Sequence, residues 1–544
     1  MQRVKRGIAA LAAVAAGIGL GAGVAPAQAA PAMTAQQRAE AAFQAMGGET
    51  QEMVTSIIIK GTMAQWEPGE SFSVGDLTKP DGGTSTFTET LDHTKNYQRI
   101  EWVRPRAAGG TRNYAEIIMP DGGYVIGNDA NGAPVKRTIT TTANLPAHTM
   151  SAIRLTATLR EIERNNIVLA MHENPGRVAD APDLATGGKS YPAVQYRGEH
   201  GTFVVAFDPA TNLPVVVRTR DFDQLMGDAD FDETFSDWRE VSGIKIAHRM
   251  TYTLNGFTIF DTTLSDARVD IVGNSLLPAD TFAVPAAIRG KAPRPAAVEK
   301  PPYQWILRRL ASGFFLDSDN LYTDDDGALA LTDVAPNVSL VTGSTHNTLI
   351  VATNTYLVAF DSPGDDGQSK IAIDLAKAKY PGKPFRYLVL THHHIDHSGG
   401  LRAYIAEGAS VVVGKGDGAF FRKVLGAPQT LNVNKPAGPV TPKVIEVADT
   451  WSVKDGGREV AAYALDNAHA AGYLMPYVPD AKLGFITDLW NPGPAVAAVN
   501  PNMIAVVQGV EKRKLAPERF AGGHAAVGNY ADLKQAAGAN SNTR

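Results

Sequence analysis

The 544-residue chain contains no cysteine. This absence excludes disulfide bonds, thiolate nucleophiles and every zinc site that uses cysteine ligands. The chain also lacks a basic excess, because 51 Lys and Arg stand against 56 Asp and Glu, which gives a net charge of -5. We therefore expect no nucleic-acid partner and no basic surface for membrane binding. Any bound metal ion must be held by imidazole and carboxylate groups.

Long apolar runs are missing after the first thirty residues. Before that point, a basic start (Arg3, Lys5, Arg6) precedes an uncharged stretch rich in Ala and Gly, and Ala27-Gln28-Ala29 has the form of a cleavage site. This pattern predicts a signal peptide over residues 1–29, cleaved near Ala29. The mature protein is then periplasmic or secreted, without stable membrane insertion. An uncleaved anchor is the alternative, but so much Ala and Gly makes the segment weakly apolar.

Three further regions are predicted after the signal peptide. Residues 30–285 consist mainly of short alternating segments separated by turn residues such as Asn255-Gly256, which predicts a β-rich domain. Helices are expected there only over residues 35–46 and in part of 150–170. Residues 286–330, rich in Pro, Ala and Lys, are expected to form a linker and covering segment. Residues 331–544 alternate apolar strands with helical stretches, which is typical of an α/β domain.

The elements expected in this α/β domain bracket the motif described next. Strand runs are predicted within residues 348–360, 387–390 and 410–413, and helices over 371–379 and 401–407. Outside the domain, the acidic residues Asp228, Asp230 and Asp232 are interpreted as a solvated loop. They do not form a calcium loop, because Glu233 and Arg239 stand where that loop needs Gly and Glu.

The segment Thr391-His-His-His-Ile-Asp-His397 follows the predicted strand over 387–390 and precedes Ser398-Gly399-Gly400. In an extended chain residues i and i+2 share a face, so His392 and His394 can approach one metal ion while His393 points away. Asp396 and His397 come after a turn and can reach a second ion, and the glycines that follow them allow a sharp bend, so that the next helix starts close by. His393 is expected to pack or to support the ligands.

Further ligands are expected where strands end downstream. His469 lies in a loop before the strand over 473–477, Asp488 follows the strand over 483–487, and His524 follows Gly522-Gly523. His346 lies in a loop that could overhang the site, and a structural role is favoured for it. The five histidines of the N-terminal domain show no ligand spacing.

The motif His-x-His-x-Asp-His, followed by the downstream His, Asp and Gly-His, resembles the metallo-β-lactamase superfamily over residues 331–534. The resemblance implies an αββα sandwich. It also implies that His392, His394 and His469 bind one metal, that Asp396, His397 and His524 bind a second, and that Asp488 bridges both. The surroundings of His469, Asn-Ala-His-Ala-Ala, differ from the usual Gly-His-Thr-x-Gly. The strand pattern of the N-terminal domain resembles the half-barrel of outer-membrane lipoprotein carriers.

The function that follows is an exported metal-dependent hydrolase. Two zinc ions per chain are expected, with Fe or Mn as alternatives, and a hydroxide between them would attack an ester, lactone, amide, phosphodiester or sulfate ester. Asp396 would bind metal and orient the hydroxide. The substrate is a small molecule, and the sequence gives no oligomeric state.

Two other functions remain open. The same scaffold can hold a single non-haem iron and act as an oxygenase, which needs fewer ligands than the seven found here. Alternatively, the β-rich domain captures a hydrophobic ligand. No Gly-x-Ser-x-Gly or phosphate-binding loop supports a serine hydrolase or a nucleotide enzyme.

Overall fold

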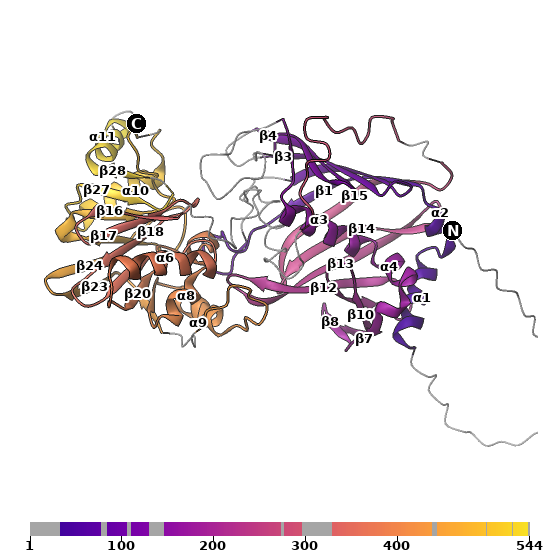
Figure 1. Cartoon of the computed structure of the whole chain (residues 1–544), viewed down its shortest axis with the longest axis horizontal. Coiled ribbons are helices and arrows are strands. Elements are labelled where there is room, and N and C mark those ends of the chain that lie inside the picture. Colours follow the sequence, from indigo (N-terminus) through magenta and orange to yellow (C-terminus); the bar gives the residue numbers. More distant parts are fainter. Residues whose placement is uncertain are drawn as a thin grey trace, which may run out of the picture.

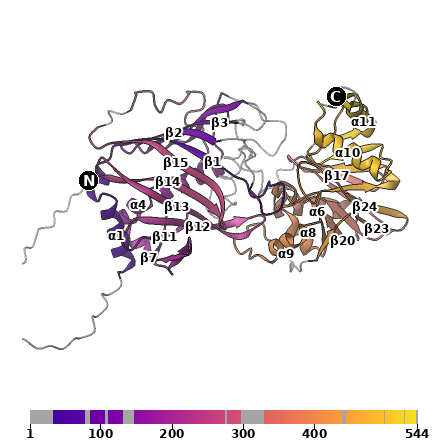
Figure 2. The ribbon, with the colours of Figure 1, turned by 180° about the vertical axis from the view of Figure 1, so that it is seen from behind.

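The computed structural model describes residues 33–77, 84–105, 110–129, 146–273, 277–295, 329–437, 443–496, 498–524 and 526–541. The predicted signal peptide lies outside these residues, as does most of the predicted linker. Figures 1 and 2 show an N-terminal module and a C-terminal module side by side along the long axis of the molecule. Among the described residues, no helix has the length and apolar character needed to span a membrane.

The N-terminal module is built on one large antiparallel sheet. Its strand order in the described residues is β6-β5-β4-β3-β2-β1-β15-β14-β13-β12-β11-β10-β7, and β8 and β9 form a separate hairpin. The strands are β1 (Ser56–Gln65), β2 (Thr84–Asp92), β3 (Tyr97–Pro105), β4 (Thr111–Met119), β5 (Gly122–Gly127), β6 (Ala147–Thr149), β7 (Val178–Asp180), β8 (Leu184–Thr186), β9 (Lys189–Tyr191), β10 (Ala193–Arg197), β11 (Thr202–Phe207), β12 (Pro214–Asp223), β13 (Gly227–Val241), β14 (Ile244–Leu254) and β15 (Phe257–Asp270).

Helices pack on one face of this sheet (Figure 1). They are α1 (Ala35–Ala45), α2 (Glu49–Met53), α3 (Ala152–Asn165) and α4 (Ile167–Glu173). The helices predicted over 35–46 and within 150–170 are therefore observed. α1 begins with a capping box, in which Thr34 and Gln37 satisfy each other's backbone N–H groups. Phe43 of α1 and Met171 of α4 join Phe203 of the sheet in one buried cluster.

The predicted acidic loop at residues 228–232 is wrong. These residues belong to β13, and their carboxylates are paired with neighbouring groups rather than solvated alone. Arg218 on β12 binds Asp232 at 2.7 Å and Asp230 at 2.9 Å. Alternating acids on β13 thus face alternating arginines on β12, a cross-strand charge pairing that stabilises the strand. The sequence of β13 alone does not show that arginines of β12 lie opposite these acids, so it predicts that the acids are solvated.

The C-terminal module has four layers, helix–sheet–sheet–helix, which confirms the predicted αββα sandwich. One sheet has the order β16-β17-β18-β19-β20-β21-β22 and the other β23-β24-β25-β26-β27-β28 in the described residues. The strands are β16 (Ala330–Ala335), β17 (Val338–Thr342), β18 (Thr348–Ala352), β19 (Leu357–Phe360), β20 (Phe385–Val389), β21 (Ser410–Gly414), β22 (Val444–Val447), β23 (Thr450–Asp455), β24 (Arg458–Ala464), β25 (Leu474–Val478), β26 (Leu483–Ile486), β27 (Arg519–Gly522) and β28 (Val527–Asn529).

Three buried clusters separate these layers. Val358 and Phe485 belong to the cluster between the two sheets. Leu388 and Tyr404 belong to the cluster beneath the helices of the first sheet, and Trp490 and Val506 to that beneath the helices of the second. The helices are α6 (Asp366–Lys379), α7 (Ile395–Ser398), α8 (Leu401–Ala406), α9 (Gly418–Gly426), α10 (Pro501–Lys512) and α11 (Tyr530–Ser541).

The strand run predicted within residues 348–360 is divided in the structure. β18 and β19 pair antiparallel, with Leu349 opposite Phe360. The Thr353 hydroxyl donates to the carbonyl of Tyr356 at 2.8 Å and closes the turn between them. The polar residues at the centre of the apolar run therefore mark a hairpin turn.

Candidate metal centre

The candidate ligands come from loops at the ends of strands in both sheets of the C-terminal module. The segment 391–397 follows β20, with Asp396 and His397 in the short helix α7. His469 lies between β24 and β25, and Asp488 and His524 follow β26 and β27 by two residues each. His346 lies between β17 and β18. Residues spread over 179 positions thus converge on one edge of the sandwich because strands of both sheets end there.

The first group contains His392, His394, His469 and Asp488, whose potential ligand atoms all lie within 4.8 Å of one another. The Nε2 atoms of His392 and His469 are 3.2 Å apart, and each lies 3.1 Å from Asp488 Oδ2. Two atoms bound to one zinc ion at about 2.1 Å lie roughly 3 to 3.5 Å apart, so this spacing fits one shared ion.

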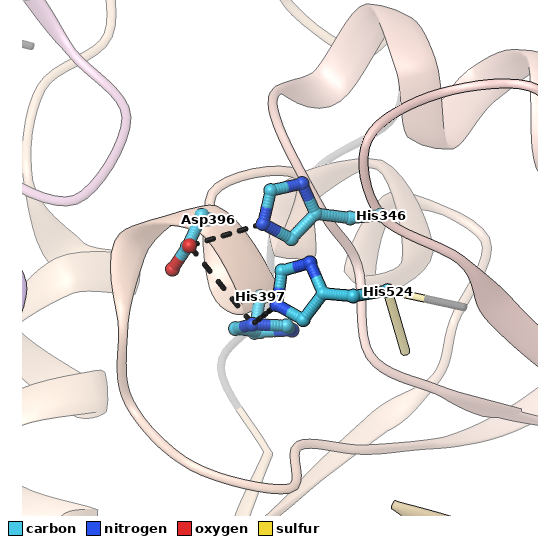
Figure 3. A group of neighbouring side chains, drawn as sticks. All are labelled: His346, Asp396, His397 and His524. Atoms are coloured by element: carbon cyan, nitrogen blue, oxygen red, sulfur yellow. Dashed lines mark hydrogen bonds and ion pairs between the residues drawn. The ribbon is translucent and has the colours of Figure 1, made fainter. Parts of the chain in front are cut away.

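The second group contains His346, Asp396, His397 and His524, within the same 4.8 Å limit. Figure 3 shows the His346 and His524 rings approaching His397, with the Asp396 carboxylate beside His346. The Nε2 atoms of His397 and His524 are 3.2 Å apart, and His346 Nε2 lies 3.0 Å from Asp396 Oδ2. Sequence reasoning favours a structural role for His346, whereas its geometry makes it a further candidate ligand.

Asp488 contacts both groups. Its Oδ2 lies 2.9 Å from His397 Nε2, and its Oδ1 lies 2.6 Å from His524 Nε2. These contacts add to those with His392 and His469 of the first group. The seven predicted ligands therefore lie together, and Asp488 occupies the position expected of a bridging carboxylate.

The outward-facing ring nitrogens of these histidines have partners elsewhere in the protein. His392 Nδ1 lies 3.0 Å from Thr391 Oγ1, His394 Nε2 lies 2.9 Å from the Ser71 carbonyl, and His524 Nδ1 lies 3.2 Å from the Thr345 carbonyl. Such contacts fix the ring and its tautomer, so that the other nitrogen presents its lone pair to the centre. The inward Nδ1 of His394 is buried and has no hydrogen-bond partner among the described residues.

The electrostatics also suit bound cations. Burial lowers the pKa of His394 to about 3, and that of His346 to about 4, so both rings are neutral at pH 7. Neutral imidazole is the form that binds metal. Burial alone would raise the pKa of Asp488, but the neighbouring imidazoles of His397 and His392 hold it well below its usual range. Burial alone would lower the pKa of His397, but the carboxylates of Asp488 and Asp396 hold it well above its usual value, so a bound cation would replace the proton of this ring. Imidazole nitrogens and carboxylates in this arrangement fit one or two divalent ions.

Asp361 is a site residue that sequence reasoning missed. It follows β19, is fully buried, and accepts hydrogen bonds from the Thr391 backbone N–H at 2.7 Å and from the Thr391 hydroxyl at 2.9 Å. Its Oδ2 also lies 3.3 Å from Nδ1 of His397. Asp361 thereby fixes both the start of the ligand segment and one ligand ring. A polar residue directly after an apolar strand was the signal that could have identified it.

The N-terminal module supplies a second unpredicted part of the site. The loop after β1 reaches across to the metal centre, where the Ser71 carbonyl accepts from Nε2 of both His393 and His394 at 2.9 Å. His393, which is expected to pack or to support the ligands, shares this carbonyl with His394. The loop is held by hydrogen bonds from the Ile395 N–H to the Gly69 carbonyl (3.0 Å) and from the Ala471 N–H to the Phe72 carbonyl (2.7 Å).

Glu70 of this loop brings a carboxylate to the centre. Its Oε2 lies 3.5 Å from Nδ1 of His394. Glu70, His394 and Asp396 also form a third group with potential ligand atoms within 4.8 Å. Because His394 belongs to the first group and Asp396 to the second, Glu70 lies beside both. No ligand spacing connects residue 70 to residue 394, so the sequence carries no signal for this contact.

Comparison with known proteins agrees with this geometry. The family model described as the metallo-beta-lactamase superfamily matches residues 341–505, a range that contains every C-terminal candidate ligand except His524. No curated protein matches the chain.

Similar solved structures include a metallo-beta-lactamase from Pontibacter korlensis, with 19% identity, 39% of this chain and 99% of that chain covered, and a TM-score of 0.31. The flavodiiron core of Flv1 from Synechocystis sp. has 14% identity over 39% of this chain and 60% of that one, with a TM-score of 0.31. The inverting sec-alkylsulfatase Pisa1 from Pseudomonas sp. has 18% identity over 45% of this chain and 43% of that one, with a TM-score of 0.30.

Proposed function

We propose that this chain, in which residues 341–505 match the metallo-beta-lactamase superfamily model, is an exported hydrolase that acts through two metal ions. The observation that carries the proposal is the arrangement of ring nitrogens. The inward nitrogens of the histidines face a common centre, while the outward nitrogens of His392, His394 and His524 are held by Thr391, Ser71 and Thr345. A merely solvated histidine cluster would not need its rings fixed in this way.

Each residue has a defined task in this proposal. His392, His394 and His469 would hold one ion; His397, His524 and Asp396 would hold the other, with His346 as an additional ligand or as a partner of Asp396. Asp488 would bridge them. Two divalent ions bound there, zinc being the best fit for imidazole and carboxylate donors, would polarise the scissile bond and supply hydroxide at neutral pH.

The loop carrying Glu70 favours one substrate class. The Glu70 carboxylate lies 3.5 Å from Nδ1 of His394, so an anionic substrate bound beside His394 would approach a negative charge there. At about 4 Å, two unit charges in a partly buried site interact by on the order of 4 kcal/mol, which reduces the attraction of the metal ions for an anion. The proposed substrate is therefore an uncharged ester or lactone rather than a phosphodiester or sulfate ester.

The test combines metal content with turnover on two substrates. Purified mature protein is expected to contain close to two zinc ions per chain by mass spectrometry and to hydrolyse p-nitrophenyl acetate in preference to bis(p-nitrophenyl) phosphate. In His394→Ala, metal content should fall and turnover should drop by about 100-fold or more, because a ligand of the first ion is lost. Glu70→Gln should raise relative activity on the phosphodiester. His200→Ala, in the turn between β10 and β11 of the N-terminal module, serves as the control.

Other outcomes would contradict the proposal. Full turnover in His394→Ala would show that the cluster is not the active site. One iron per chain together with oxygen consumption would instead support the oxygenase alternative. A preference for the phosphodiester that Glu70→Gln leaves unchanged would refute the substrate class while leaving the metal centre intact.

A further inference from the structure

A cavity of about 330 Å³ lies in the N-terminal module between the inner face of the sheet and helices α3 and α4. A smaller cavity of about 190 Å³ shares much of its lining, including Met63, Ile100 and Trp102. The walls are largely aliphatic and aromatic. This size and lining are typical of pockets that bind small molecules, which combine apolar walls with a few polar groups.

Two carboxylates interrupt the apolar lining. On β2, alternate residues face inward, and Glu89 stands between Phe87 and Leu91. Its neighbours across the sheet are Ile59 on β1 and Ile100 on β3. A position surrounded by isoleucines on an inward face is where the strand pattern calls for an apolar residue. Glu233 on β13 is the second such carboxylate, and it also lines both cavities.

Neither Glu89 nor Glu233 has an ion-pair partner among the described residues. The other acids around the cavities do: Glu116 binds Arg154 at 2.7 Å, and Glu161 binds Arg164 at 3.1 Å. Isolated carboxylates in an apolar wall are costly, because burial removes their hydration. Burial accordingly raises the pKa of Glu233 to about 7, although nearby Arg164 opposes the change.

The remaining charged groups do not neutralise these two carboxylates. Arg104 donates to the Tyr114 hydroxyl at 2.8 Å, and Lys245 lies 3.4 Å from Glu240. Burial lowers the pKa of His93, so this ring adds no positive charge at pH 7.

Unused hydrogen-bonding capacity faces the same space. Gln98 donates to Glu89 through its amide nitrogen, but its Oε1 is buried without a hydrogen-bond partner. The hydroxyl of Tyr252, which lines the smaller cavity, is also buried without one. Buried polar atoms are normally paired, so several unpaired atoms in one cavity indicate a bound molecule that satisfies them.

We propose that this cavity binds an amphiphilic amine, whose apolar chain lies among the isoleucines and whose ammonium group is held by Glu89 and Glu233. An ammonium group supplies both the positive charge that these carboxylates lack and N–H donors for Gln98 Oε1. A carboxylate or sulfate head group would be repelled, and an uncharged chain would leave the acids unpaired. The site lies within the N-terminal module and does not depend on the proposed metal chemistry.

The test is calorimetric titration of the full-length protein with decylamine, decanol and decanoate, each below its micelle-forming concentration, at pH 7.5. We expect decylamine to bind at least about tenfold more tightly than decanol, with decanoate weakest. Glu89→Gln and Glu233→Gln should each remove most of this preference while decanol binding persists. Glu173→Gln, an exposed change on α4, is the matched control.

Both glutamine variants should fold, because each replaces a carboxylate that lines the cavity with an uncharged isostere. Their unfolding temperatures, measured alongside, should equal or exceed that of the wild type. Absence of binding by all three probes would overturn the site. Equal binding of the three, or tightest binding of decanoate, would overturn the role of the two carboxylates. If Glu89→Gln and Glu233→Gln both kept the wild-type preference for decylamine over decanol, the role of the two carboxylates would also be overturned.

Discussion

Two aspartates at the metal centre hold backbone conformations that non-glycine residues rarely adopt. Asp361 has φ 59° and Asp488 has φ 61°, both in the left-handed region. Such conformations cost on the order of 1 kcal/mol or more each and persist where the surroundings enforce them. Asp361 directly follows β19, and Asp488 follows β26 after Thr487, so the turn aims each carboxylate back at the histidines. The left-handed backbone of Asp361 and Asp488 therefore directs both carboxylates toward the histidines of the metal centre.

A third aspartate provides a pH-dependent prediction. Asp417 is buried, and its Oδ2 has no hydrogen-bond partner among the described residues. Burial, with repulsion from Glu446, raises the pKa of Asp417 from 3.8 to about 7. The folded chain therefore keeps a proton between these pH values that the unfolded chain has released. The contribution of the protonated Asp417 carboxyl to the free energy of unfolding is fully present below pH 3.8 and is lost as pH rises through about 7.

Asp417→Asn removes this loss, since the amide stays neutral. The variant should match the wild type near pH 3 and exceed its unfolding free energy by on the order of 2–4 kcal/mol at pH 8. Urea unfolding at several pH values measures the difference. Exposed Asp183→Asn is the control and should show no such trend. An Asp417→Asn advantage that is equal at every pH would contradict the argument.

At the residue scale, the sequence predicts candidate metal ligands but not the carboxylates of Asp361 and Glu70 that contact their imidazole rings. His392, His394, Asp396 and His397 form a contiguous pattern, so their chemistry can be read from spacing. Asp361 and Glu70 are single carboxylates whose relation to the histidines exists only in the folded chain. Linear spacing contains no information on which distant residue will contact an imidazole.

At the scale of elements, the end of β21 limits how closely the loop of His469 can pack. A Cβ added at Gly414 would lie 1.5 Å from the carbonyl oxygen of Gly472. The two backbones therefore touch where the loop turns back into β25. Only glycine permits this approach, and the loop position sets that of the His469 ring.

Gly414→Ala should consequently destabilise the protein and disturb the first metal group. We expect a loss of about 2 kcal/mol or more, because backbone rather than a mobile side chain must move. Metal content should fall at the same time. Thermal unfolding and mass spectrometry test both effects. The matched control is Gly426→Ala in α9, where an added Cβ meets nothing within 4 Å. Equal behaviour of the two variants would contradict the packing argument.

Elements themselves were predicted well where the apolar pattern is strong, as for β20, β21 and α6. The failures have specific causes. The run over 348–360 carries its turn in polar residues that also fit a strand, and the acids of β13 look solvated until Arg218 and Arg220 of β12 are beside them. Strand pairing is a long-range property, and a single sequence does not show it.

At the scale of the whole molecule, the two modules are joined by directed hydrogen bonds. Asp228 of β13 accepts from the Thr430 N–H at 2.8 Å, the Thr430 hydroxyl at 2.6 Å and the Leu431 N–H at 3.0 Å. Arg402 of α8 is buried and donates to the Gln224 and Leu225 carbonyls of the N-terminal module. These bonds fix the position of the N-terminal module, and with it the loop whose Ser71 carbonyl contacts His394 at the metal centre.

These contacts predict that the modules unfold together. Asp228→Ala removes three hydrogen bonds between them and should lower the unfolding free energy by about 1–3 kcal/mol. It should also split a single calorimetric transition into two, because the less stable module no longer gains from its partner. Asp230→Ala is the matched control: it lies on the same strand, but among the described residues its carboxylate forms ion pairs with Arg218 and Arg220 of its own module. One unsplit transition in Asp228→Ala, shifted no more than in Asp230→Ala, would show that other contacts couple the modules. A third result is that the Asp228→Ala transition splits while turnover falls and the metal content stays full. That result would show that the loop carrying Ser71 contributes to the active site.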